Sequence, residues 1–167
     1  MSQRQTQPIR PDVLPLSLKS SSRLQRKADY TFSFCGDAVS AIYDRLEATG
    51  TDRNIGHTID SWTSRLALFS GIEVKREGGS KDEALTQLAI WLCAGLENHR
   101  KLAKCPAEDL LPVVGWTVVG HDWHLYIAYR ALNHRGLDTV VRGISLSELI
   151  HFLYENYSLC RLVLTWK

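Results

Sequence analysis

Two residues able to do chemistry lie close together in the short stretch Ser70-Gly-Ile-Glu-Val-Lys75. If this stretch is a strand, Glu73 and Lys75 project to the same side, because side chains alternate between the two faces. Such a carboxylate holds a hard cation such as Mg²⁺, and the lysine orients or polarises an attacking water. The pair therefore suits metal-assisted hydrolysis of a phosphodiester. The alternative interpretation is an exposed ion pair on a sheet face.

The hydrophobic pattern predicts the elements that would position this pair and two further polar residues, Asp29 upstream and Gln87 downstream. Alternating apolar residues predict strands, and apolar residues at helical spacing predict helices. The expected strands cover residues 26–34, 66–75, 112–119, 124–130 and 137–142, with a further one in the tail at 159–166. The expected helices cover residues 38–48, 81–99 and 145–157. This order indicates an α/β fold in which helices flank a central mixed sheet.

Local signals mark the ends of these elements. Asp37 is the expected N-cap of the first helix and Gly50 its stop. The other two helices begin with sequences typical of a capping box, Ser80 with Glu83 and Ser145 with Glu148. Two hairpins are expected, with turns at Gly120-His-Asp-Trp123 and Asn133-His-Arg-Gly136.

Composition places the chain among ordinary globular proteins. Its 167 residues are 44% hydrophobic and 23% charged, with a formal net charge of +2. This charge permits a nucleic-acid partner without requiring one. Residues 1–22 are polar and rich in proline and serine, which predicts a flexible lead-in before a single domain at 23–167.

No apolar run reaches the roughly 18 residues of a membrane span, and the N-terminus lacks the apolar core of a secretory signal. The four cysteines form no Cys-x-x-Cys pair, which argues against a zinc site. We therefore expect an intracellular protein, cytoplasmic or nuclear, with reduced thiols and no membrane partner. The sequence leaves the oligomeric state open.

Six short motifs, taken in order, resemble the PD-(D/E)XK nuclease-like proteins that are numerous in filamentous fungi. The resemblance covers about residues 24–157, and the ordered set is more specific than any one motif. The motifs are Lys27-Ala-Asp-Tyr30, Gly56-His-Thr58, Gly71-Ile-Glu-Val-Lys-Arg76, Leu85-Thr-Gln-Leu-Ala-Ile-Trp91, Leu111-Pro-Val-Val114 and Val119-Gly-His-Asp-Trp123.

The resemblance implies a restriction-endonuclease-like core and a site carried over residue by residue. Asp29 matches the family's metal-binding aspartate, Glu73 the second carboxylate and Lys75 the lysine that positions water. Gln87 matches a glutamine that such nucleases often direct at the site. The cofactor would be Mg²⁺ or Mn²⁺, and the backbone carbonyl of Val74 is a further candidate ligand. Gln87 also lies among apolar helix neighbours, where a half-buried amide needs a partner.

Other polar residues have simpler interpretations. The alternative for Asp29 is a solvent-facing strand position, and for Gln87 a solvated helix position stays open beside support of the site. For His57, Thr58 and Asp60, capping of a loop is preferred to chemistry, with Asp60 as the substitute if Asp29 points away.

His121 and Asp122 fit a hairpin turn, and no serine or cysteine motif supports a catalytic triad with them. Trp123 is interpreted as a core anchor in preference to a base-stacking platform. Two basic groups are interpreted as solvated faces, with phosphate contact as the alternative: Lys19, Arg23, Arg26 and Lys27, and His99, Arg100, Lys101 and Lys104.

The first functional hypothesis is a metal-dependent nuclease-like hydrolase that cleaves phosphodiester bonds in DNA or RNA. The second is a binding or scaffold module that keeps the fold without turnover. The third is a reassigned enzyme of specialised metabolism, which uses the same Glu/Lys site for acid–base work on a small molecule. A deep apolar pocket beside Glu73 would favour the third hypothesis.

Overall fold

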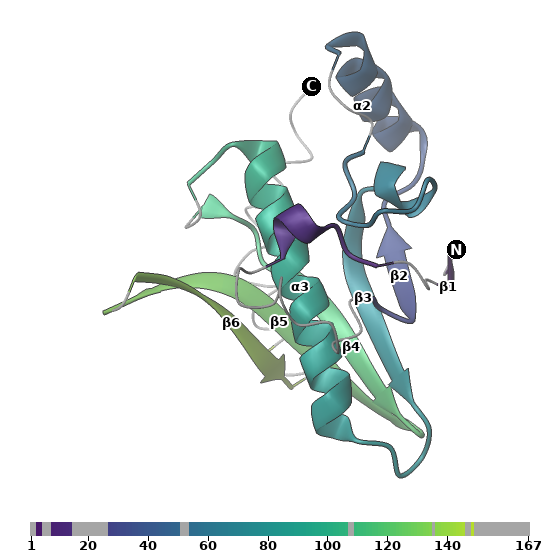
Figure 1. The fold of residues 1–167 in the computed structure, drawn as a ribbon, viewed down its shortest axis with the longest axis vertical. Coiled ribbons are helices and arrows are strands. Elements are labelled where there is room, and N and C mark those ends of the chain that lie inside the picture. Colours follow the sequence, from purple (N-terminus) through teal and green to yellow (C-terminus); the bar gives the residue numbers. More distant parts are fainter. Residues whose placement is uncertain are drawn as a thin grey trace.

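A computed structural model describes residues 3–4, 8–14, 27–50, 54–106, 109–134, 136–145 and 148. Its centre is a mixed sheet in the spatial order β1-β2-β3-β4-β5-β6 (Figure 1). The strands are β1 (Gln3–Arg4), β2 (Tyr30–Ser33), β3 (Leu68–Lys75), β4 (Val113–Val119), β5 (Asp122–Asn133) and β6 (Gly136–Ile144). Neighbouring strands are antiparallel except β3 and β4, which are parallel. The predicted α/β fold around a mixed sheet is confirmed.

The parallel pair exists because a long helix, α3 (Lys81–Ala103), connects β3 to β4 and crosses the sheet. The Ser80 side chain caps this helix by accepting a hydrogen bond from the Glu83 backbone N–H at 3.1 Å, as the capping sequence predicted. In Figure 1 the helix runs along β3 and β4, and its first turn lies near the end of β3. Residues on these two elements can therefore meet.

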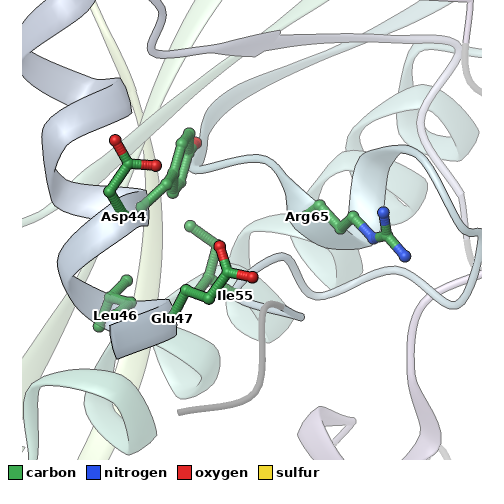
Figure 2. Close-up of a pocket in the computed structure, with 6 residues that line it drawn as sticks. Asp44, Leu46, Glu47, Ile55 and Arg65 are labelled. Carbon is green, nitrogen blue, oxygen red and sulfur yellow. The ribbon is translucent and has the colours of Figure 1, made fainter. Parts of the chain in front are cut away.

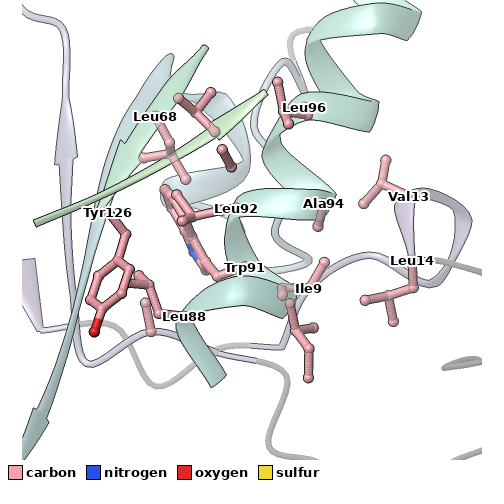
Figure 3. Packing of buried hydrophobic residues seen from close by; sticks show 14 residues of the cluster. Ile9, Val13, Leu14, Leu68, Leu88, Trp91, Leu92, Ala94, Leu96 and Tyr126 are labelled. Atoms are coloured by element: carbon pink, nitrogen blue, oxygen red, sulfur yellow. The ribbon is translucent and has the colours of Figure 1, made fainter. Parts of the chain in front are cut away.

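The hydrophobic core lies between α3 and the sheet (Figure 3). Leu88, Leu92 and Leu96 of the helix are completely buried, as the apolar stripe predicted. Two strand glycines let the helix approach closely. A Cβ atom at Gly71 would lie 2.9 Å from Trp91 Cε3, and one at Gly115 would lie 2.8 Å from Leu88 Cδ1.

Residues 8–14 cover the other side of α3 (Figures 1 and 3). The sequence placed them in a flexible lead-in, but Ile9, Val13 and Leu14 are buried in the core. Ile9 also forms an isolated bridge with Thr58, and the short 3-10 helix η1 (Pro11–Val13) follows it. The polar, proline-rich composition concealed this packing, because few but well-spaced apolar residues suffice to dock a short segment. That residues 23–167 form a single domain remains a prediction.

The helix α2 (Asp37–Ala48) lies away from the core, at the top of Figure 1. Gly36 takes the N-cap position with φ 113°, so the prediction that Asp37 is the N-cap is wrong by one residue. Gly50 adopts φ 68° after the last turn, as expected of a helix stop. The Tyr43 hydroxyl of α2 accepts a hydrogen bond from the Ala67 backbone N–H at 2.8 Å.

Both predicted hairpins are present. Gly120, at φ 60°, and His121 form the two-residue turn between β4 and β5. In the second hairpin, the last residue of β5 pairs with Gly136, the first residue of β6. The capping box of Ser145 and Glu148 is also observed, with reciprocal hydrogen bonds of 2.9 Å and 3.3 Å. The rest of the predicted last helix and the tail strand fall outside the described residues.

The described cysteines Cys35, Cys93 and Cys105 are free thiols, and burial raises the pKa of the half-buried Cys93. In the part of the chain that the structure describes, no helix combines the length and apolar character needed to cross a bilayer.

Candidate functional site

Glu73 and Lys75 lie together on the face of β3 that α3 covers. The Lys75 Nζ is 3.3 Å from Glu73 Oε1. Glu73 is 3% exposed as a residue, and Lys75 is half-buried. The alternative of an exposed surface pair therefore does not describe them. A buried charged pair is costly to desolvate and needs further hydrogen bonds to be tolerated.

Two side chains of α3 supply those hydrogen bonds. Lys75 Nζ donates to Gln87 Oε1 at 2.8 Å and to Glu83 Oε1 at 3.0 Å. Gln87 Nε2 in turn donates to Glu83 Oε1 at 3.2 Å. An ammonium has three donors, and these contacts with Glu73, Glu83 and Gln87 use all three. Gln87 is buried, and the partner that its position required is the lysine together with Glu83.

Glu83 is the member of this site that sequence reasoning missed. Its place three residues after Ser80 explained it as half of a capping box. A second signal was available, because Glu83 and Gln87 are four residues apart and so share one face of a helix. Once Gln87 is placed at the site, this spacing brings Glu83 with it.

Asp29 lies immediately before the first residue of β2, and its side chain contacts β3 near the site. Its backbone N–H donates to the Ile72 carbonyl at 3.1 Å, and its Oδ2 accepts the Val74 N–H at 2.8 Å. Regular pairing of β2 with β3 ends at Tyr30 opposite Ile72. The N–H of Val74, beyond this last pair on β3, therefore meets the side chain of Asp29 and no strand. We call Asp29, Glu73, Lys75, Glu83 and Gln87 the site cluster.

Burial and the surplus negative charge of the site cluster both act on Glu73. Burial raises the pKa of Glu73, the nearby Asp29 carboxylate raises it further, and Lys75 offsets only part, which leaves it at about 7. Burial disfavours the Lys75 ammonium, but hydrogen bonds to Glu83 and Glu73 outweigh it and raise its pKa. The Lys75 ammonium is thus favoured at the site.

Asp60 serves its own loop, so it is not needed as a substitute for Asp29. Its Oδ1 accepts the backbone N–H groups of Trp62 at 3.0 Å and Thr63 at 2.7 Å, and its Oδ2 contacts the Thr63 hydroxyl. Burial opposes ionisation of Asp60, but the hydrogen bonds from Thr63 and Trp62 outweigh it and lower its pKa. The hydroxyl of Thr58 also pairs with that of Thr63 at 2.7 Å. The loop-capping interpretation is confirmed for Asp60.

His57 is a buried core residue, and loop capping does not describe its side chain. It is 1% exposed and packs edge-on against Trp91, with 4.5 Å between ring centroids. Neither ring nitrogen has a hydrogen-bond partner. Burial, together with the charges of His99 and Arg10, lowers its pKa to about 3.

The hairpin residue Trp123 is 60% exposed, so its interpretation as a core anchor is wrong. It meets Trp116 edge to face, with ring centroids 6.3 Å apart, at the end of the β4–β5 hairpin. In the second basic group, Lys101 and Arg100 form ion pairs with Asp12 and Glu97. In the first group, Lys19, Arg23 and Arg26 lie outside the described residues.

A hard cation fits the donors of the site cluster, although the arrangement is not a complete cage. Among the described residues, no three side chains of histidine, cysteine, aspartate or glutamate are grouped as a metal site. Mg²⁺ is usually bound through one or two carboxylates and keeps several waters. Asp29 and Glu73 can supply these two carboxylates. Burial and the nearby Asp29 carboxylate raise the pKa of Glu73, so a bound cation would favour its ionised form.

A cavity of about 200 Å³ lies elsewhere, between α2 and the segment after it (Figure 2). It is lined by Tyr43, Asp44, Leu46, Glu47, Ile55 and Arg65. The acidic side chains come from α2, and Arg65 comes from the opposite segment. None of these residues belongs to the site cluster, so this cavity is not a substrate pocket beside Glu73.

Comparison with known proteins places the chain in a family. No curated protein and no solved structure matches it. The family model described as the PD-(D/E)XK nuclease superfamily matches residues 2–152, which include the N-terminal segment packed on α3. The match is to the superfamily, so the fungal subgroup remains a prediction. With this match and the sheet-and-helix architecture described above, the chain belongs to the PD-(D/E)XK nuclease superfamily.

Proposed function

We propose that this protein is a metal-dependent hydrolase that cleaves phosphodiester bonds in DNA or RNA. One observation carries the proposal. The buried carboxylate of Glu73 is near a second carboxylate, that of Asp29, and contacts the Lys75 ammonium. Side chains of α3 hold this ammonium in place. Membership of a nuclease superfamily gives this arrangement its most direct interpretation.

In this proposal, Asp29, Glu73 and the backbone carbonyl of Val74 hold Mg²⁺ or Mn²⁺. When bound, the cation neutralises charge that develops on the phosphate and makes water more acidic. The protein contributes the placement of the backbone that carries both carboxylates. Asp29 is held by the Val74 N–H at 2.8 Å, and Glu73 is held within a strand and covered by α3.

Lys75 positions the attacking water. In the structure its three donors point to Glu73, Glu83 and Gln87, and the contact with Glu73 is the longest of the three at 3.3 Å. A reacting water needs one of these donors, and the longest contact is the one released at least cost. Glu83 and Gln87 then keep the lysine in place while the third donor serves the water.

The nucleic acid would be held through its backbone. The described residues contain no recognition helix of a known groove-reading type, and phosphate contacts position a substrate without reading its sequence. We place this activity inside the cell, in the cytoplasm or nucleus.

A second candidate is a binding or scaffold module without turnover. It is favoured by the direct contact of Lys75 with Glu73, since an ion pair of this kind can replace a cation. The small-molecule alternative would need a pocket beside Glu73, and the cavity described above lies elsewhere. We therefore rank the small-molecule alternative last.

The test is cleavage of mixed DNA and RNA substrates with Mg²⁺ or Mn²⁺, comparing the wild type with Glu73→Ala and Lys75→Ala. Metal-dependent cutting that both substitutions abolish supports the proposal. A well-folded wild type that cuts nothing with either metal refutes it. Retained binding of nucleic acid in that case would favour the scaffold module.

A further inference from the structure

The hydroxyl of Thr117 on β4 is completely buried and has no hydrogen-bond partner. Thr117 is 0% exposed, and its Oγ1 is an unsatisfied polar atom. A buried hydroxyl without a partner loses its hydrogen bonds to water and gains none from the protein. A valine of the same shape would avoid this cost, so the threonine calls for an explanation outside the stability of the fold.

Thr117 lies directly beside Glu73. The two residues are register partners in the parallel pair of β3 and β4, so their side chains lie on the same face of the sheet. That face is covered by α3, because a Cβ atom at the neighbouring Gly115 would meet Leu88 and Leu92 of the helix. Side chains of registered neighbours lie close enough to interact.

Glu73 can use such a donor. Its Oε1 is 3.3 Å from Lys75, and a carboxylate has two oxygens, each able to accept hydrogen bonds. A threonine hydroxyl rotates freely about its C–O bond and has one proton to donate. It can therefore serve the carboxylate of its register partner Glu73.

We propose that Thr117 is a positioning residue for Glu73: its hydroxyl donates to the Glu73 carboxylate and holds it in the orientation that binds the cation. This inference rests on the proposed function. It explains why a fully buried hydroxyl is unpaired while Glu73 contacts Lys75, since its partner is in place only when Glu73 has turned from Lys75 to the cation. Oriented ligands of this kind are held by hydrogen bonds from residues that do not touch the metal.

Three variants test the proposal. Thr117→Val keeps the shape and removes the hydroxyl, and Thr117→Ser keeps the hydroxyl. Ser70→Ala is the matched control, because Ser70 is also a buried and unpartnered hydroxyl of this sheet, but it pairs with Val114 and so faces away from α3. Each variant is measured for thermal unfolding without metal, for Mn²⁺ binding by electron paramagnetic resonance, and for cleavage.

Thr117→Val is expected to unfold at the same or a higher temperature than wild type. It should bind Mn²⁺ about tenfold more weakly and cleave at least about tenfold more slowly, the size expected of one hydrogen bond to a charged group. Thr117→Ser should restore both properties. Ser70→Ala should leave Mn²⁺ binding and cleavage unchanged.

A lower unfolding temperature in Thr117→Val would show that the hydroxyl serves the fold, and would overturn the proposal. Unchanged Mn²⁺ affinity would overturn it as well. A wild type that binds Mn²⁺ without cleaving refutes the proposed function alone, because the effect of Thr117→Val on Mn²⁺ affinity still decides the role of Thr117. A wild type that does neither refutes both.

Discussion

Charged and amide side chains make tertiary hydrogen bonds at both ends of α3, but the two ends hold different parts of the protein in place. At the first end, Glu83 and Gln87 hold Lys75 of β3. At the last end, Asn98 donates to the Ile55 carbonyl at 2.7 Å, and Lys101 donates to Asp12 at 2.9 Å. We call Arg10, Asp12, Glu97, Asn98 and Lys101 the anchor cluster. Glu97 pairs with Arg100 and Arg130, and the other four residues tie the segment of residues 8–14 to the helix.

The carboxylates at the two ends show what the difference means. At the anchor cluster, burial alone would raise the pKa of Asp12, but Lys101 and Arg10 outweigh it and lower the pKa. Hydrogen bonding to Arg100 lowers the pKa of Glu97. At the site cluster, burial and Asp29 raise the pKa of Glu73 to about 7. A partly exposed network with balanced charges keeps its carboxylates ionised. Burial and surplus negative charge favour the protonated form of Glu73 at the site cluster, and a bound cation there would offset both.

The largest expected effect separates the two ends by activity. Lys75→Met should lower the cleavage rate by about 10² to 10⁴, because a positioned group at the reacting water contributes that much. The same substitution at the other end, Lys101→Met, should change the rate by less than about threefold, since Lys101 is a partly exposed ion-pair partner. Single-turnover cleavage of both variants measures the difference. Equal losses would show that the two ends do not differ in function.

The second prediction concerns His57, which packs against the α3 side chain Trp91. Its pKa is about 3 in the folded protein, against 6.5 for an unperturbed histidine. The unfolded chain therefore binds more protons between these values, and folding stability falls as pH drops from about 6.5 toward 3. His57→Phe should remove a loss of about 3 to 4 kcal/mol between pH 7 and pH 4. Urea unfolding at several pH values measures it.

The control for this experiment is His134→Gln, at an exposed turn position. The free energy of unfolding of this variant should fall between pH 7 and pH 4 as steeply as that of the wild type. An unchanged slope in His57→Phe would mean that His57 gains a proton in the folded protein without disturbing the fold.

The third prediction has the opposite slope and belongs to the site cluster. Glu73 has a folded pKa of about 7, against 4.5 for an unperturbed glutamate, so the folded state binds more protons between these values. Without metal, folding stability should therefore fall as pH rises from about 4.5 to 7. Glu73→Gln should remove this loss, which we expect to be about 2 to 3 kcal/mol. Urea unfolding across this pH range measures it.

Glu97→Gln, from the anchor cluster, is the matched control. The pKa of Glu97 is lowered, so its contribution to stability is present above pH 4.5 and is lost only at lower pH. The stability profile of this variant between pH 5 and pH 7 should run parallel to that of wild type. Parallel stability profiles for Glu73→Gln and wild type would contradict the prediction that the carboxylates at the two ends of α3 differ electrostatically.

The smallest expected effect is at Asp12, whose side chain is 53% exposed. Asp12→Asn should lower the free energy of unfolding by less than about 1 kcal/mol, because exposed ion pairs contribute little. High salt should shrink the effect further. Denaturant unfolding at low and high salt measures it, with the exposed Asp109→Asn as control. A loss of several kcal/mol would mean that the anchor cluster depends on charge more than on the burial of Ile9, Val13 and Leu14.

Sequence patterns predicted the framework of the fold well. Strand alternation placed Glu73 and Lys75 on one face, and the capping sequence at Ser80 placed the start of α3. Both succeed because they depend on backbone geometry within a few residues. Of the strand expected over 26–34, the described residues 27–34 give only Tyr30–Ser33, since pairing with β3 ends at Tyr30.

What sequence patterns missed depends on distant neighbours. Nothing local to Trp123 indicates that its ring stays 60% exposed at the hairpin end, and nothing local to Ile9 indicates that it is buried. Glu83 was explained by its cap alone, although its carboxylate contacts Lys75 eight residues earlier. Such contacts require the relative placement of a helix and a strand.

The sequence by itself determined which residue types lie on which face of β3 and α3, because backbone periodicity fixes that locally. Only the tertiary structure decided how the charges behave. The parallel pairing of β3 with β4 puts Thr117 beside Glu73, and the cover of α3 removes Glu73 from water. The physical reason is that burial and neighbouring charge set the pKa of a carboxyl, and both come from residues far away in the chain.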